Sequence, residues 1–224
     1  MRSQGKDSIH EVIYVLTDVT VAIYAICYQK LLTIVIIILT IIEFAMSIPS
    51  DLLASESITF EGAIELTQSL LSEIEADRLS QGEIQQAVAS LVKTPNGARG
   101  FFVTYLTDDR PLADEPSPGV LDALREAPEI VAELLVKNLA MSAAMVVHHS
   151  RHHSEEMAAG SARVQGRSHH LIQTLQLPAC QTLAQQMLES LRNGEGEYEQ
   201  FFQRWGYDRE QKDAIGSAVR EAIG

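Results

Sequence analysis

Residues 129–159, EIVAELLVKNLAMSAAMVVHHSRHHSEEMAA, form the longest helical pattern in the chain. At about 100° per residue, its apolar side chains gather on one face of a helix. Glu133 and Lys137 lie one turn apart on another face, where an i,i+4 ion pair can meet water. Pro128 directly before the stretch is typical of the first turn of a helix. The pattern therefore predicts a long helix with one buried face.

The chain after this stretch has well-marked helix boundaries. Gly160-Ser161 is expected to turn the chain, and Gly194 and Gly206 are typical residues after a helix end. Asp208 and Gln211 have the spacing of a capping box. The predicted helices cover residues 162–177, 179–192, 197–205 and 209–223.

The chain before residue 128 has a similar pattern. Thr59 can cap a helix over 60–77, and Ser80 with Glu83 forms a capping box for a helix over 81–92. GFFVTYLTDD, residues 100–109, is rich in strand-forming residues, but no partner strand follows, so a helix is expected. After a polar loop over 108–118, Ser117-Pro118 starts a short helix that runs to Ala127. The acidic pairs of that loop, Asp108-Asp109 and Asp114-Glu115, are expected to be solvated, because their spacing does not fit a calcium-binding loop.

These elements predict an all-α fold, a single multi-helix bundle of about seven or eight helices over residues 46–224. An apolar segment, residues 1–45, precedes it. The chain has 17 basic and 30 acidic residues, of which 14 and 26 fall in residues 51–224, so the negative charge belongs to the helical domain. Nucleic acid is excluded as a partner, because phosphate contacts need clustered Lys or Arg side chains.

The segment over residues 1–45 allows three interpretations. Residues 19–42 are long enough for one membrane span, because their fourteen Ile, Val and Leu residues outweigh the cost of Lys30. Ala45-Met46-Ser47 has small residues at the spacing of a signal-peptide cleavage site, although the preceding region is long for a signal peptide. The composition also changes abruptly at Met46, as if translation begins there.

Localisation depends on which interpretation holds. A start at Met46 predicts a cytoplasmic protein without the apolar segment. A real span predicts a single-span anchor with residues 50–224 outside, because Arg2 and Lys6 precede the span and no Lys or Arg follows it before Arg78. Only in that case is a membrane a partner.

Six of the seven histidines fall within residues 148–170. A helical hairpin that turns at Gly160 would place His169 and His170 beside His149 and His152. The i,i+4 spacings and the step from His152 to Glu156 suit a transition metal such as Zn, Ni, Cu or Fe. The candidate ligands are His148, His149, His152, His153, Glu156, His169 and His170.

Two other interpretations of the histidines are open. They can form a hydrated helix end whose imidazoles bond to nearby Ser and Glu side chains. They can also form a pH-responsive contact, because imidazole titrates near pH 6.5.

The C-terminal region concentrates aromatic residues. Five of them fall within ten residues and are candidates either for core packing or for docking a protein partner: Tyr198, Phe201, Phe202, Trp205 and Tyr207. Cys27 and Cys180 are expected to be core thiols. No catalytic residue is assigned, because the sequence has no nucleophile elbow, phosphate-binding loop or dinucleotide fingerprint.

The main prediction is therefore a non-enzymatic helical module for protein–protein interaction or self-association. The alternative is a helical metal-binding protein that uses the histidine cluster on two antiparallel helices.

Overall fold

The computed structural model describes residues 28–37 and 48–224. The chain divides into two units, residues 1–47 and 48–224. In the first unit, residues Tyr28–Ile37 form an apolar helix whose large side chains are exposed. The rest of the predicted span over 19–42, the cleavage site at Ala45-Met46-Ser47, and Cys27 lie outside the described residues.

The second unit is all-α, as predicted, and the described residues contain no strand. It has nine α-helices where seven or eight were expected. They are α2 (Phe60–Glu75), α3 (Gln81–Val92), α4 (Pro95–Thr107), α5 (Pro118–Arg125), α6 (Pro128–Arg151), α7 (Glu155–Leu175), α8 (Pro178–Asn193), α9 (Glu199–Trp205) and α10 (Arg209–Ile223), with short 3-10 helices at Ser50–Leu52 and Pro111–Ala113.

The predicted helix caps of α2, α3 and α10 are present. Thr59 accepts a hydrogen bond from the Gly62 backbone, and Ser80 with Glu83 forms the capping box of α3. Asp208 and Gln211 form the capping box of α10. Each cap satisfies backbone N–H groups that the first turn of a helix leaves without a partner.

The ambiguous stretch over residues 100–109 belongs to helix α4, which begins earlier, at Pro95. Gly100 allows this helix to pass very close to α2. A Cβ atom at residue 100 would lie 2.5 Å from the Cβ of Ala63, so a larger residue would force the two helices apart. Phe101, Phe102 and Tyr105 extend from α4 into the core and are almost fully buried.

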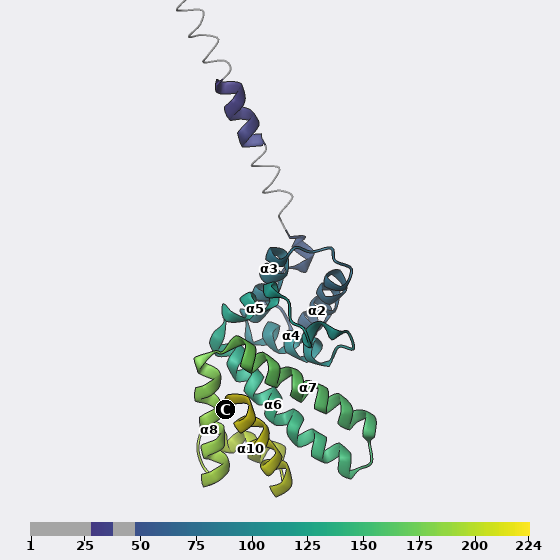
Figure 1. Ribbon diagram of the computed structural model, residues 1–224, viewed down its shortest axis with the longest axis vertical. Helices are drawn as coiled ribbons and strands as arrows, with labels where there is room; N and C mark the ends of the chain where they lie inside the picture. Colours follow the sequence, from purple (N-terminus) through teal and green to yellow (C-terminus); the bar gives the residue numbers. More distant parts are fainter. Residues whose placement is uncertain (1–27, 38–47) are drawn as a thin grey trace, which may run out of the picture. The chain divides into compact units, whose positions relative to one another are not determined.

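Helices α6 and α7 lie side by side and antiparallel (Figure 1). The predicted turn at Gly160-Ser161 is wrong: the chain reverses at residues 152–154, and both Gly160 and Gly166 lie inside α7. A helical glycine costs only about 1 kcal/mol, and the long packed contact between the two helices outweighs that cost. His153 instead adopts the left-handed conformation of the turn, with φ of 54°.

Helices α8 and α10 pack against each other and against α6 on the far side of the hairpin, while α2 to α5 gather at the other end of the unit (Figure 1). Among the described helices, only α6 is long and apolar enough to cross a membrane, judged by length and composition. Its apolar residues Val131, Leu135 and Leu139 are buried in the core. The length and hydropathy of α6 are therefore explained by its central position in the bundle.

Candidate functional site

A groove of about 1080 Å³ runs along the exposed side of α6. Its floor comes from α6, one wall from α4 and the other from α8 and α9. The lining residues used below are Arg99, Val103, Glu129, Ile130, Glu133, Leu134, Lys137, Asn138, Met141, Glu197, Tyr198, Gln200, Phe201, Arg204 and Trp205. A second hollow, of about 330 Å³, lies between α6, α7 and α10 and is much smaller than the groove.

The floor of the groove is a stripe of half-buried side chains at helical spacing. Ile130, Leu134 and Met141 follow one side of α6, with Lys137 and Asn138 between them. From Glu129 to Met141 this stripe is about 18 Å long at 1.5 Å per residue. The floor therefore matches the length of about three helical turns.

Each wall presents a large apolar side chain to solvent. On the α4 wall, Val103 is 45% exposed, and on the α9 wall Trp205 is 50% exposed. Trp205 is the only tryptophan of the chain. Beside Val103, the Arg99 guanidinium lies 5.2 Å from the centre of the Phe60 ring. Apolar side chains on both walls and on the floor give the groove a surface that another apolar face could cover.

The aromatic cluster of the C-terminal region is brought together as a group around Phe201. The Phe201 ring centre lies 6.2 Å from that of Tyr198, 5.5 Å from that of Phe202 and 6.0 Å from that of Tyr207. Tyr198, Phe202 and Tyr207 are buried, whereas Phe201 is half-buried and Trp205 is exposed. The five residues therefore divide: Phe202 and Tyr207 belong to the core, and Tyr198, Phe201 and Trp205 line the groove.

The start of the groove is acidic. Glu129 and Glu133 lie one turn apart on α6, and Glu197 precedes α9. Burial, together with the nearby charges of Glu133 and Glu197, raises the pKa of Tyr198 to about 12. Glu133 accepts a hydrogen bond from Lys137, as the i,i+4 spacing predicts. Glu129 and Glu197 have no ion pair with any other described residue.

The chain from Tyr198 to Asp208, which includes α9, advances along α6 from near Glu133 to Arg151. Tyr198 lies near Glu133 in the first half of α6, and Asp208, which follows α9, pairs with Arg151 at the end of α6. Arg204 and Trp205, at the end of α9, therefore lie toward Met141, away from the acidic end. Within the described part of the chain, the Arg204 side chain has no ion pair or hydrogen bond.

The structure does not bring the predicted histidine ligands together. His148, His149 and His152 lie at the end of α6, where the His148 and His152 ring centres are 4.4 Å apart. The turn at residues 152–154 places His169 about 18 Å farther along α7 than the position opposite His149. The predicted grouping was wrong because the turn was placed at Gly160, seven residues too late.

The other predicted ligands lie apart from one another. His153 is in the turn, and Glu156 is exposed in the first turn of α7. The His169 ring nitrogen Nε2 lies 3.4 Å from the Glu221 carbonyl oxygen of α10, and His170 lies near Asp114. Within the described residues, no three His, Cys, Asp or Glu side chains lie together as a metal site would require.

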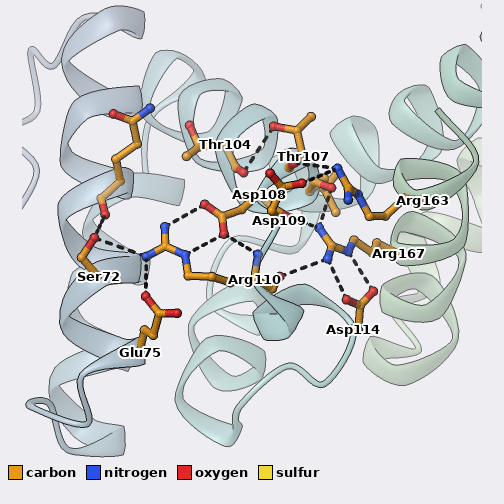
Figure 2. Close-up of polar contacts among 12 residues, drawn as sticks. Ser72, Glu75, Thr104, Thr107, Asp108, Asp109, Arg110, Asp114, Arg163 and Arg167 are labelled. Carbon is orange, nitrogen blue, oxygen red and sulfur yellow. Dashed lines mark hydrogen bonds and ion pairs between the residues drawn. The ribbon is translucent and has the colours of Figure 1, made fainter. Parts of the chain in front are cut away.

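Sequence reasoning missed a second cluster, which is centred on Arg167 of α7 (Figure 2). The Arg167 side chain is 2% exposed, and all five of its N–H groups donate hydrogen bonds. Two bonds reach the Asp114 carboxylate, over 2.8 and 2.6 Å, and three reach the backbone carbonyls of Leu106, Asp108 and Arg110. We call this cluster the Arg167 hub.

The segment over residues 108–114, predicted to be a solvated loop, is held by this hub. Arg110 donates two hydrogen bonds to Asp108, each over 2.7 Å, and one to Ser72 of α2 over 3.2 Å (Figure 2). Arg167 and Arg110 thereby connect α7, the segment and α2. The sequence contains one signal that Arg167 is buried. Arg167 lies four residues before Leu171 and three after Val164, so it falls on the apolar face of α7.

Cys180 is buried at the start of α8, and burial raises the pKa of its thiol to about 11. A neutral thiol in the core is a weak nucleophile. The predicted core role of Cys180 is therefore confirmed.

Comparison with known proteins places the chain in a family. Residues 59–222 match the model of a family described as uncharacterised conserved protein UCP020893. No curated protein and no solved structure gives a significant match. The matched range runs from the N-cap of α2 to the last turn of α10, so it includes both the groove and the Arg167 hub. Because the match covers most of the chain, the protein belongs to this family of uncharacterised conserved proteins.

Proposed function

We propose that this protein is a non-enzymatic interaction module that binds a protein partner in the groove along α6. The observation that carries the proposal is the pair of exposed apolar side chains on opposite walls, Val103 and Trp205, above a half-buried apolar floor. Leaving such side chains in water forgoes stability, since covering apolar surface gains about 25 cal/mol per Å². A partner that covers the groove would recover that free energy.

The composition of the groove supports the proposal. Trp, Tyr, Arg and Met are enriched at the centres of protein–protein interfaces, and Trp205, Tyr198, Arg204 and Met141 all line the groove. Of the four large apolar residues that are exposed within residues 48–224, two lie here. Core packing alone explains Phe202 and Tyr207, but it does not explain an exposed tryptophan next to them.

Photo-crosslinking in the organism of origin tests the proposal. A photoreactive amino acid replaces Trp205 in the full-length chain, and the matched control carries it at Glu189, which is exposed on α8 and does not line the groove. We expect a specific protein adduct from position 205 and none from position 189. The same adducts from both positions, or none from position 205, would overturn the proposal.

A second variant tests whether the apolar walls hold the partner. Deletion of the region after Glu195 is unsuitable, because it removes the buried residues Phe202, Ile215 and Val219. Val103→Asp combined with Trp205→Asp changes only exposed positions, so the bundle should remain folded. The crosslinker is then placed at Gln200, which also lines the groove. We expect the double variant to lose the adduct that this crosslinker gives in the otherwise unchanged chain.

A further inference from the structure

The two ends of the groove differ in charge, and this difference restricts what can lie in it. Glu129 and Glu197 at one end have no ion pair among the described residues, and Glu133 is only partly offset by Lys137. Arg204 at the other end and Arg99 on the α4 wall are likewise without an ion pair among the described residues. The occupant should therefore be positively charged where it meets the acidic end and negatively charged where it meets Arg204.

The shape of the groove restricts the occupant further. A floor about 18 Å long between two apolar walls fits the apolar face of one amphipathic helix of about three turns. Such helices commonly carry acidic residues in their first turn and basic residues in their last turn, because these charges oppose the helix macrodipole. The charge order of an ordinary helix therefore fits the groove in one direction only.

We infer that the groove takes an amphipathic helix of another protein, lying antiparallel to α6, with its acidic first turn at Arg204 and its basic last turn at Glu129 and Glu197. This inference rests on the proposed function and adds the chemical class and the direction of the partner. The apolar face of the helix would cover Leu134 and Met141 on the floor and contact Val103 and Trp205 on the walls.

Trp205 provides the measurement, because it is the only tryptophan and is half exposed. Two tryptophan-free synthetic peptides of identical composition and identical apolar pattern serve as probes. The forward peptide has Glu in its first turn and Lys in its last, and the reversed peptide has these charges exchanged. Burial of the Trp205 indole by a bound peptide shifts its emission to shorter wavelength.

With the full-length protein, we expect the forward peptide to bind about tenfold more tightly than the reversed one, since several exposed charge contacts change sign. The difference should shrink at about 1 M salt, where exposed charges are screened. Equal affinities, or no change in Trp205 emission with either peptide, would overturn the inference.

The two peptides also differ in their own helix stability, which could by itself favour the forward peptide. A protein variant with exchanged charges controls for this difference, because the same two peptides are compared. The variant Glu129→Lys, Glu197→Lys and Arg204→Glu should prefer the reversed peptide, whereas Glu189→Lys should behave like the unchanged protein. A variant that still prefers the forward peptide would contradict the assigned direction. If crosslinking at position 205 captures a partner while the peptides show no directional preference, the inference fails and the proposed function stands.

Discussion

The Arg167 hub and the groove both gather charged side chains from several helices, but they differ in what those charges contact. In the hub, every N–H of Arg167 donates to a carboxylate or a carbonyl, and Asp108 and Arg110 bond to each other. In the groove, Arg204, Glu129 and Glu197 have no ion pair among the described residues. A buried cluster with every group hydrogen-bonded stabilises the fold, whereas exposed, hydrated charges without an ion pair can pair with the charges of a ligand.

Replacing Arg167 should change the free energy of unfolding more than any other substitution in the hub or the groove. Arg167→Met leaves three backbone carbonyls and the Asp114 carboxylate without their donor, so the free energy of unfolding should fall by about 3–5 kcal/mol. Urea unfolding followed by circular dichroism measures the change. Arg163→Met is the matched control on the same helix, because its pair with Asp109 is exposed and should contribute no more than about 1 kcal/mol. Equal losses in the two variants would show that the hub does not stabilise the fold.

The next effect separates the core from the groove within the aromatic cluster. Phe202→Ala removes a fully buried ring and should cost about 3 kcal/mol, whereas Trp205→Ala removes an exposed ring and should cost well under 1 kcal/mol. Thermal unfolding of both variants checks this. A Trp205→Ala loss as large as that of Phe202→Ala would mean that Trp205 is a core residue and not a docking residue.

A smaller effect concerns the pH dependence of the hub. The Arg167 hydrogen bonds hold the pKa of Asp114 below its ordinary value of 3.8, so the unfolded chain binds more protons than the folded chain as the pH falls below that value. The contribution of Asp114 to the free energy of unfolding is fully present at pH values above its pKa in the unfolded chain. It is lost as the pH falls through the lower pKa of Asp114 in the folded chain.

Asp114→Asn removes the titrating group. At neutral pH the substitution should cost about 1 kcal/mol, because Asp114 is half exposed and solvent screens its pair with Arg167. Below about pH 4, the variant should lose less further stability than the unchanged protein does. Unfolding curves at a series of acidic pH values compare the two slopes, and parallel slopes would contradict the role given to Asp114.

Replacing Arg204 should have the smallest effect on the free energy of unfolding. Because its side chain has no partner among the described residues, Arg204→Ala should change the free energy of unfolding by less than about 0.5 kcal/mol. The same variant should weaken binding of the forward peptide, measured by Trp205 emission. A clear loss of stability with unchanged peptide binding would mean that Arg204 stabilises the fold and does not bind the peptide.

Local signals in the sequence were sufficient to predict most of the fold. The caps at Thr59, Ser80 and Asp208 each depend on residues within three positions, so the starts of their helices could be located. The turn between α6 and α7 could not be located in the same way. Its position depends on how far two helices pack against each other, and that contact allowed Gly160 to stay helical.

The candidate site was harder to predict for a related reason. The five aromatic residues lie close together in the sequence, but only tertiary packing decides that Phe202 is buried while Trp205, three residues later, is exposed. The role of Arg167 depends on carbonyls that are distant in sequence, between Leu106 and Arg110, and no local pattern indicates them. The groove itself involves α4, α6, α8 and α9 and has no counterpart in a single stretch of sequence.

Hydrogen–deuterium exchange of the full-length protein, with and without the forward peptide, shows directly whether the groove along α6 is the docking site. With the peptide bound, we expect slower amide exchange in α9, Glu199–Trp205, and in the part of α4 around Val103, and unchanged exchange at the hub in residues 108–114. Protection of the hub or of the α6–α7 turn, with no change in α9, would contradict the assignment of the groove as the docking site.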